Sequence, residues 1–539
     1  MTMTTTKILQ CFAAAALLTF AASCSSDDIT PETEKAEAAS KGYAGQGAFI
    51  SIAHNGEAAT RTSMDWDKGK FFWEADDYIY VRDDHNAFRK ISNTNPGPRK
   101  PNFDFDLPSS DFTKSAYLVY YPGEKGHNDQ VTIAAEQTQT APNNTDHFGV
   151  SGDCGMGVAK KRNGLFKFDL NHKASYLRFL PYTSHQLVST YITKIEVVSD
   201  NNIAGAYTLD PVAYKLVGAG SQKTITLHIN KAAGYSHGFP LKNNAPDSKL
   251  NSAFMVIAPG KHKLSVKYYV KDIQTGVDGV ITDEYGTFDY RENTYYDVKS
   301  RLDVEPYDAK AYMWDAVNHY WQGFEDVQPA LNGDLPNPNY PQNASDSHNR
   351  WFNTTLMNGL GTRQATHVAK DCPNVNEILW YIHKGDPHWD DVKLWTALKH
   401  LYKGGLWLKK AYAIASDNGG ISPSALKESF NGKDYRQGTK AMQKEFPFRV
   451  KGIPQTPPAN TTNYFYLPAI DNYLFGEIRQ GTGRGMGLEG QYWTSTCYAL
   501  PKTADGQMYY GAFNFTFKRT HVGVHRSMRE SGMQCMKFR

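Results

Sequence analysis

Polar and apolar positions alternate in short runs through residues 46–305, which is the pattern of half-buried β-strands. In YITKIEVVS (191–199), for example, Tyr191, Thr193 and Ile195 lie on one face of an extended chain and their neighbours lie on the other. Few helical patterns interrupt these runs, and many short strands at regular spacing predict β-sandwiches. The other runs of this kind include AFISIAH (48–54), YIYVRD (78–83), AYLVYYP (116–122), KTITLHI (223–229) and HKLSVKYYV (262–270).

The pattern changes near residue 306. In DVKLWTALKHLYKG (391–404), Val392, Trp395 and Leu398 recur at helical spacing, so we expect an amphipathic helix whose apolar face belongs to a core. NVNEILWYIH (374–383) predicts a second helix. Strand-like runs follow, and residues 306–539 are therefore predicted to form an α+β module. These predicted strands are NYFYLPAIDNY (463–473), GQYWTSTCY (490–498), QMYYGAFNFTFKR (507–519), THVGVHRS (520–527) and SGMQCMKFR (531–539).

An apolar run of about 15 residues lies near the N-terminus, after Lys7 and from Ile8 to Ala22. It is too short for a transmembrane helix, because roughly 20 apolar residues are needed to cross a bilayer. A short apolar run between a basic residue and small residues is the layout of an export signal, so we expect residues 1–23 to be a signal peptide. Residues 24–45 have almost no large apolar side chains, which indicates a flexible tether.

Composition and charge narrow the class of protein. The chain after the tether is long enough for two to four domains. Its formal net charge is only +3 and it contains no long basic tract, so a nucleic-acid partner is not expected. Aromatic residues make up 13% of the chain, which favours strands and binding surfaces.

The cysteines of the folded part are scattered along the chain. They show no CxxC spacing, so we expect no zinc framework. Cys497 and Cys535 are a candidate disulfide if their strands are neighbours, because export permits disulfides. Unpaired buried thiols are the alternative. The four cysteines concerned are Cys154, Cys372, Cys497 and Cys535.

One short segment carries many potential metal ligands. HKGDPHWDD (383–391) contains two histidines and three aspartates, and its central Gly-Asp-Pro predicts a turn between two helices. No HExxH pattern is present, so a metal site is not expected. The chain also has no GxSxG, no P-loop and no Cys/His nucleophile pattern. We therefore expect no enzymatic activity and no cofactor. The residues of the segment are His383, Asp386, His388, Asp390 and Asp391.

Four stretches in the first half resemble, in this order, successive signatures of fimbrillin-family pilus subunits of the Bacteroides type. The resemblance covers about residues 46–305. It implies two tandem transthyretin-like β-sandwich domains, 46–175 and 176–305. The stretches are TRTSMDWDKGKFFWEADDYIYVRD (60–83), FKFDLNHKASYLRFLP (166–181), FMVIAPGKHKLSVKYYV (254–270) and ENTYYDVKSRLDV (292–304).

The same resemblance implies how such a subunit is exported and assembled. Ala21-Ala22-Ser23-Cys24 is similar to a lipoprotein lipobox, which implies acylation of Cys24, and an ordinary signal peptide with a chance cysteine is the alternative. Asp27 and Asp28 resemble the acidic export tag of surface lipoproteins. Fimbrillin-like subunits exchange strands after an arginine-specific protease removes the first strand. Here that strand would be Phe49 to His54, and Arg61 is the candidate cleavage site unless it is an ordinary loop arginine.

Residues 306–539 resemble the C-type-lectin-like module of Bacteroides surface and fimbrial tip proteins. YFYLPA, GQYWTST and the closing Gly-x-x-Cys strand carry this resemblance. A calcium-dependent lectin would need an Glu-Pro-Asn or Gln-Pro-Asp loop and a Trp-Asn-Asp segment, and neither occurs. Calcium-dependent sugar binding is therefore not expected. The aromatic residues of this module suit either stacking on sugar rings or a β core.

Together these features predict a fimbrial tip subunit, or adhesin, that is exported as a lipoprotein, accepts a strand from another subunit and presents its C-terminal module. Its partners would be other fimbrial subunits, the outer membrane through the lipid anchor, and a glycan or protein of a host or bacterial surface. We expect it at the cell outer membrane or the fimbrium tip. The alternative is a stand-alone surface glycan-binding lipoprotein that does not polymerise.

Overall fold

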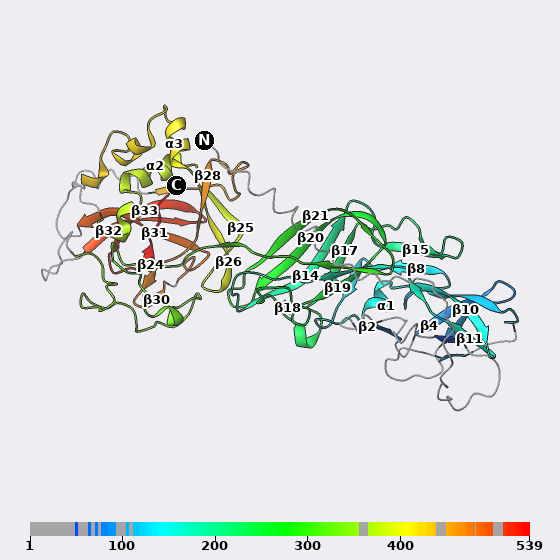
Figure 1. Cartoon of the computed structure of the whole chain (residues 1–539). Coiled ribbons are helices and arrows are strands. Elements are labelled where there is room, and N and C mark those ends of the chain that lie inside the picture. Colours follow the sequence, from blue (N-terminus) through cyan, green and yellow to red (C-terminus); the bar gives the residue numbers. More distant parts are fainter. Residues whose placement is uncertain are drawn as a thin grey trace, which may run out of the picture. The chain divides into compact units, whose positions relative to one another are not determined.

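The computed structural model describes residues 49–51, 63–65, 70–73, 77–92, 104–106, 111–354, 365–437, 449–479, 481–499 and 510–538. Within these ranges the chain is mainly β with several sheets, which confirms the predicted class (Figure 1). None of the helices in the described ranges is long and apolar enough to span a bilayer. The predicted lipidation, export and cleavage residues, Cys24, Asp27, Asp28 and Arg61, lie outside the described residues.

The first strands form an eight-stranded sheet of order β5-β4-β7-β10-β11-β1-β6, with β12 paired to β10. Its core is aromatic: Trp73 is fully buried and meets Phe105 and Tyr121 edge-on, at ring-centroid distances of 5.2 and 5.6 Å. The strands of this region, with the separate β2-β3 pair, are β1 (Phe49–Ser51), β2 (Ser63–Asp65), β3 (Lys70–Phe72), β4 (Tyr78–Arg82), β5 (Phe88–Ser92), β6 (Asp104–Phe105), β7 (Ala116–Tyr121), β10 (Gly155–Arg162), β11 (Leu165–Phe168) and β12 (Asn171–His172).

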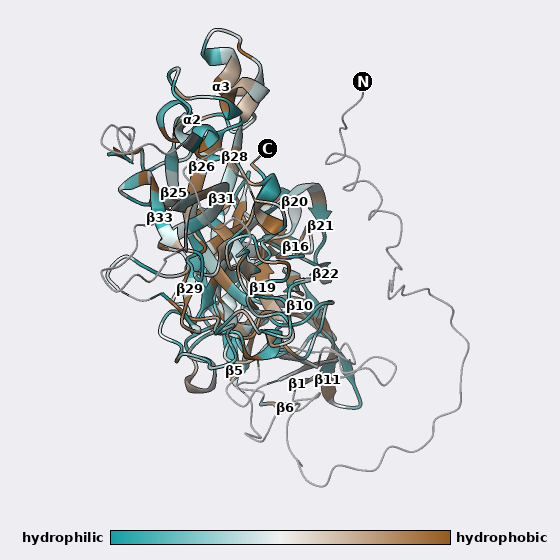
Figure 2. Ribbon diagram, turned by 90° about the vertical axis from the view of Figure 1, so that its left-hand side faces the viewer, coloured by the Kyte–Doolittle hydropathy of each residue, from teal (hydrophilic) through white to brown (hydrophobic). Residues whose placement is uncertain are grey.

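Three further sheets follow, of orders β19-β13-β22, β21-β20-β14-β17-β9 with β18 on β14, and β16-β15-β8. Burial alternates along these strands as the sequence pattern predicts. In β20, for example, Leu264, Val266 and Tyr268 are buried between more exposed neighbours. Figure 2 shows apolar residues along the strands and hydrophilic ones along most loops. The elements are β8 (Gln130–Ile133), β9 (Glu136–Thr138), α1 (Phe148–Ser151), β13 (Ser175–Phe179), β14 (Thr190–Ser199), β15 (Gly205–Asp210), β16 (Lys215–Val217), β17 (Thr224–His228), η2 (Ala233–Tyr235), β18 (Phe239–Pro240), β19 (Ala253–Ile257), β20 (Gly260–Asp272), β21 (Asp278–Tyr290) and β22 (Thr294–Val298).

The part of the chain predicted as a C-terminal module, residues 306–539, contains both helices and strands in its described ranges. It has a four-stranded sheet, β23-β25-β26-β28, and a six-stranded sheet, β24-β34-β31-β32-β33-β27. Its elements, with β23 at its boundary, are β23 (Glu305–Pro306), β24 (Ala311–Tyr312), η3 (Glu325–Val327), η4 (Val368–Asp371), α2 (Val375–Lys384), β25 (His388–Ala397), β26 (His400–Lys409), α3 (Ala411–Asp417), η5 (Pro423–Lys427), η6 (Tyr435–Gln437), β27 (Arg449–Lys451), β28 (Tyr464–Pro468), β29 (Tyr473–Leu474), β30 (Glu477–Ile478), β31 (Glu489–Ala499), β32 (Tyr510–Lys518), β33 (His521–Met528) and β34 (Met533–Gln534).

Helix α2 confirms the helix predicted at 374–383. The Asn374 side chain accepts a hydrogen bond from the Glu377 backbone N–H (3.0 Å), and the Glu377 carboxylate accepts one from the Asn374 N–H (2.8 Å). This capping box satisfies two of the N–H groups that a helix start leaves unpaired. The apolar face of α2 packs in one core cluster with residues of β31 to β33.

The helix predicted at 391–404 is wrong, because these residues form the β25-β26 hairpin. Ala397 pairs with His400, so Leu398 and Lys399 make a two-residue turn with φ of 49° and 66°. Val392, which the helix would bury, is 75% exposed at a register shift in β25. Apolar residues at i, i+3 and i+6 also occur in a hairpin with a bulge, and here pairing with β28 decides the outcome.

This hairpin contacts the preceding sheet through a buried polar group. The Asp272 carboxylate at the end of β20 accepts hydrogen bonds from Ser189 Oγ (2.6 Å) and from Thr190 Oγ1 (3.1 Å) at the start of β14. It also accepts one from the backbone N–H of Leu401 in β26 (3.2 Å). We call this group of contacts the Asp272 joint.

Candidate ligand-binding site

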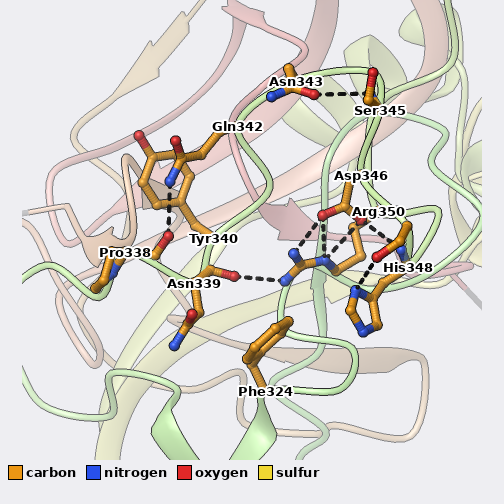
Figure 3. A pocket seen from close by; sticks show the side chains of 11 residues that line it. Phe324, Pro338, Asn339, Tyr340, Gln342, Asn343, Ser345, Asp346, His348 and Arg350 are labelled. Atoms are coloured by element: carbon orange, nitrogen blue, oxygen red, sulfur yellow. Dashed lines mark hydrogen bonds and ion pairs between the residues drawn. The ribbon is translucent and has the colours of Figure 1, made fainter.

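Two adjoining hollows lie on the C-terminal module and share Tyr340 and Gln342, which separate them. The first has a volume of about 360 Å³ and the second about 160 Å³. Together we call them the twin hollow. The first is lined by Phe324, Pro338, Asn339, Tyr340, Gln342, Asn343, Ser345, Asp346, Ser347, His348 and Arg350 (Figure 3), and the second by Met313, Tyr320, Tyr340, Pro341, Gln342, Trp351, Leu474, Phe475 and Glu530.

A buried ion pair holds the loop around the first hollow. Arg350, 4% exposed, donates from Nη2 to Asp346 Oδ2 (2.5 Å) and from Nη1 to the backbone oxygens of Asn339 (2.8 Å) and Tyr320 (3.2 Å). Burial by itself raises the pKa of Asp346, but the hydrogen bonds from Arg350 outweigh it and the pKa lies below its ordinary value. The guanidinium is thus occupied by protein oxygens, and its role is to shape the loop rather than to bind an anion.

Short turns complete this loop and explain its sequence. The Asn343 side chain accepts from the Ser345 N–H (2.9 Å), and Gln342 Nε2 donates to the Pro338 oxygen (2.9 Å). Asparagine favours such turns because its side chain accepts hydrogen bonds from nearby backbone N–H groups, and proline favours them because its ring restricts φ. The Pro/Asn-rich segment LPNPNYPQN therefore presents amide groups and the Tyr340 ring at the surface of the module.

The second hollow is walled by aromatic rings. The Tyr320 and Tyr340 rings are nearly parallel at 6.4 Å, and Phe475, at φ 51°, is 60% exposed. Glu530 supplies a carboxyl group: its Oε2 is buried without a hydrogen-bond partner among the described residues, and burial raises its pKa. An aromatic wall with one unsatisfied polar atom suits a ligand that has an apolar face and hydroxyl groups.

The residues of HKGDPHWDD do not converge on one point. Asp386 accepts from Tyr464 Oη (2.6 Å), and Asp390 accepts from Trp407 Nε1 (2.9 Å). Asp391 pairs with Arg519 (3.5 Å). His383 stacks on Phe430 (5.3 Å), and His388 Nδ1 contacts the Thr456 oxygen (2.8 Å). His388 Nε2 also lies 3.4 Å from Asp386 Oδ2, so the structure brings these two residues together, whereas the other three side chains contact protein partners outside the segment.

One group in the described ranges, Asp83, His85 and Asp111, has potential ligand atoms within 4.8 Å of one another. Arg89 lies between the two carboxylates, with its Nε 2.7 Å from Asp83 and its Nη2 3.7 Å from Asp111. The other Asp83 oxygen accepts the N–H groups of His85 and Ala87 (2.9 and 2.8 Å). The arginine already supplies the positive charge that a cation would bring.

The Asp272 joint contains a hydroxyl, an imidazole and a carboxylate, but not in the geometry of a nucleophile. Ser189 Oγ donates to Asp272 (2.6 Å), and His400 Nδ1 lies 3.1 Å from that hydroxyl and 3.4 Å from the carboxylate. All three side chains are buried. The serine proton is therefore directed to the carboxylate, which makes this a structural contact.

The Cys497–Cys535 disulfide stays a prediction, and the structure places three cysteines at one buried cluster, to which Cys372 and Cys497 belong and against which Cys535 packs. Cys497 lies on β31 opposite Ala512 of β32. Burial raises the pKa of Cys535, and the nearby thiol of Cys372, which directly follows η4, raises it further. Sequence reasoning missed the place of Cys372 in this cluster and also the twin hollow. The only available signal for the hollow was the Pro/Asn-rich loop.

No family model matches the chain, and no curated protein matches it. Among solved structures, the chain is similar to a fimbrial protein from Bacteroides ovatus (11% identity, 90% of this chain and 97% of that one, TM-score 0.21). It is also similar to the fimbrial anchor protein Mfa2 from Porphyromonas gingivalis (9%, 47% and 89%, TM-score 0.20). A third match is a candidate cell adhesion protein from Bacteroides uniformis (16%, 48% and 93%, TM-score 0.28).

Proposed function

We propose that this protein is a fimbrial adhesion subunit of the tip class, exported as a lipoprotein and assembled by strand exchange, whose C-terminal module binds a surface glycan. The observation that carries the proposal is the position of β1. This strand is inserted between β11, to which it is parallel, and β6, to which it is antiparallel. β1 is the first strand of the described ranges, and a strand that enters its sheet in this way is one that a partner's strand can replace.

The contacts of β1 indicate what its removal would leave. Phe49 is fully buried, stacked on Phe166 at 4.8 Å and edge-on to Phe112 at 5.5 Å. Trp73 Nε1 donates to the buried Ser51 hydroxyl (2.9 Å). Without β1, the backbone groups of β11 and β6 would lose their partners and an aromatic pocket would open. A donated strand with a large apolar side chain at the Phe49 position would pair with these backbone groups and fill the aromatic pocket.

The position of β34 and the residues after it supports the proposal that the subunit accepts a strand in its sandwich but does not donate residues 533–538 to a neighbour. β34 lies between β24 and β31 in the six-stranded sheet. The Phe538 ring then meets Tyr381 at 5.2 Å and Phe465 at 5.3 Å in the module's core. Extending these residues towards a neighbour would expose that core, so we propose that they are not the donor segment.

Mass spectrometry of the N-terminus tests the assembly proposal. Protein from sheared fimbriae is expected to begin at Thr62, and protein from the cell surface at acylated Cys24. Arg61→Ala should prevent incorporation into fimbriae, whereas Arg291→Ala, at an exposed arginine of the sandwich, should not. Acylated Cys24 in every fraction, with no fimbrial fraction, would contradict the proposal and favour a stand-alone glycan-binding lipoprotein.

The twin hollow is the proposed glycan site. The face of a sugar ring would pack against Tyr340 and Phe475, and its hydroxyls would reach the Glu530 carboxyl and the amides of the Pro/Asn-rich loop. On a glycan array, Tyr340→Ala is expected to reduce binding at least tenfold, because ring truncation removes the shared wall of both hollows. Tyr412→Ala is the matched control, since Tyr412 is a half-exposed tyrosine on α3 of the same module. Equal loss in both variants would exclude the twin hollow as the site.

A further inference from the structure

We propose that Cys372 and Cys535 form a disulfide that ties the last strand of the C-terminal module to the start of helix α2. Burial raises the pKa of the Cys535 thiol and the neighbouring Cys372 thiol raises it further, so the two thiols lie close enough to interact. Cys372 is 6% exposed and belongs to a small cluster with Trp314, Trp493, Cys497 and Met533, against which Cys535 packs. The cluster thus offers Cys535 two thiol neighbours, and the interaction described above favours Cys372 over Cys497 as its partner.

The backbone on both sides is anchored to β31, so the thiols do not meet by chance. Next to Cys372, the Pro373 oxygen accepts the Ser495 N–H (3.1 Å), and the Val375 N–H donates to Thr496 Oγ1 (3.1 Å). Next to Cys535, Gln534 pairs with Tyr492 of the same strand. One strand therefore positions both segments, which favours the approach of the two side chains that a disulfide requires.

The chemistry needs an oxidant of the disulfide class. One thiolate of the pair attacks a sulfur of the oxidant and forms a mixed disulfide with release of one thiol. The second thiolate then displaces the other, so one protein S–S bond forms and the oxidant leaves as two thiols, having taken up two electrons and two protons. Burial raises the pKa of Cys535, which makes this exchange slow at neutral pH and faster in mild alkali.

The bond would close a loop of about 160 residues that contains α2, α3 and β25 to β33. A cross-link over so long a loop restricts the unfolded chain strongly, and we expect it to raise the Tm of the C-terminal module by roughly 10 °C. This proposal is independent of fimbrial assembly and of sugar binding.

The test uses the purified full chain, oxidised with glutathione disulfide at pH 8.5, alkylated without reduction and digested for mass spectrometry. The expected result is a peptide pair that links Cys372 to Cys535 and a Tm that falls on addition of reductant. Cys372→Ser and Cys535→Ser should abolish that reductant effect. Cys497→Ser, at the cysteine that the sequence favours as the partner, should preserve it.

Three results would overturn the proposal: alkylation of both Cys372 and Cys535 after complete oxidation, a linked peptide that joins Cys497 to Cys535, or an unchanged Tm when a confirmed Cys372–Cys535 bond is reduced. The peptide map of the unmutated protein decides the linkage even if a serine variant does not fold.

Discussion

Replacing Asp272 with asparagine is expected to destabilise the end of β20 and the β25-β26 hairpin together. The carboxylate is fully buried and accepts five hydrogen bonds from hydroxyl or backbone N–H donors, at 2.6 to 3.2 Å, with His400 Nδ1 at 3.4 Å. An asparagine has one accepting oxygen, so its NH₂ group must face buried donors on one side. The five donors are Ser189 Oγ, Thr190 Oγ1 and the N–H groups of Gln274, Thr275 and Leu401.

The size of the effect follows from these donors. A buried donor left without its acceptor costs about 1–3 kcal/mol, and the remaining hydrogen bonds lose the help of the charge. We therefore expect Asp272→Asn to lower the free energy of unfolding by about 2–4 kcal/mol. Burial by itself raises the pKa of Asp272, but the hydrogen bonds from His400 and Ser189 outweigh it and hold the pKa well below its ordinary value.

That shift sets the sign of the pH dependence. A carboxyl group with a depressed pKa in the folded state stabilises the protein above its unfolded pKa, near 4, and loses this contribution as pH falls further. The difference between the original chain and Asp272→Asn should therefore be full at pH 7 and shrink below about pH 4.

Urea unfolding followed by tryptophan fluorescence measures the effect, because eight of the ten tryptophans lie in residues 306–539. Asp278→Asn is the matched control: Asp278 also contacts β26, through Lys403 (2.9 Å), but its side chain is 72% exposed. An exposed ion pair contributes little, so this control should change the free energy of unfolding by less than about 0.5 kcal/mol. Equal effects of the two substitutions would refute the argument that the buried hydrogen bonds stabilise the Asp272 joint.

Two further substitutions test local features of the C-terminal module. Lys399→Gly should raise the free energy of unfolding by about 0.5–1 kcal/mol, because Lys399 has φ 66° in the two-residue hairpin turn and glycine adopts that conformation without strain. A lower free energy of unfolding in urea would contradict this prediction. Asp471 tests a buried charge, since burial and then the nearby Glu489 raise its pKa to about 6. The native state therefore holds a proton that the unfolded chain releases, so the stability that this group contributes is full below about pH 4 and is lost as pH rises through 6. Between those pH values, the free energy of unfolding of Asp471→Asn should rise by about 2–3 kcal/mol relative to that of the original chain. A difference that stays constant in urea titrations across that range would disprove this prediction.

The elements that sequence predicts well are those whose signals are local. Helix α2 has its capping residues and its apolar face within one segment, so its start at Asn374 follows from the sequence. The strands of the first half follow from alternation, as in β14 and β20. The hairpin at 388–409 has no such local signal, because leucine and lysine, which form its turn at 398 and 399, are not typical turn residues. Only pairing between β26 and β28 distinguishes it from a helix.

By itself, therefore, the sequence determined that the chain is rich in strands, that its hydrophobic pattern changes near residue 306 and that residues 374–383 form a helix. The tertiary structure alone decided which distant residues meet. Tyr320, Tyr340, Phe475 and Glu530 come together as one hollow although more than 200 residues separate the first from the last. Cys372, Cys497 and Cys535 likewise gather at one buried cluster although more than 160 residues separate the first from the last. Periodicity reports which face of a segment is buried, whereas the identity of its neighbours depends on sheet order, which long-range pairing sets.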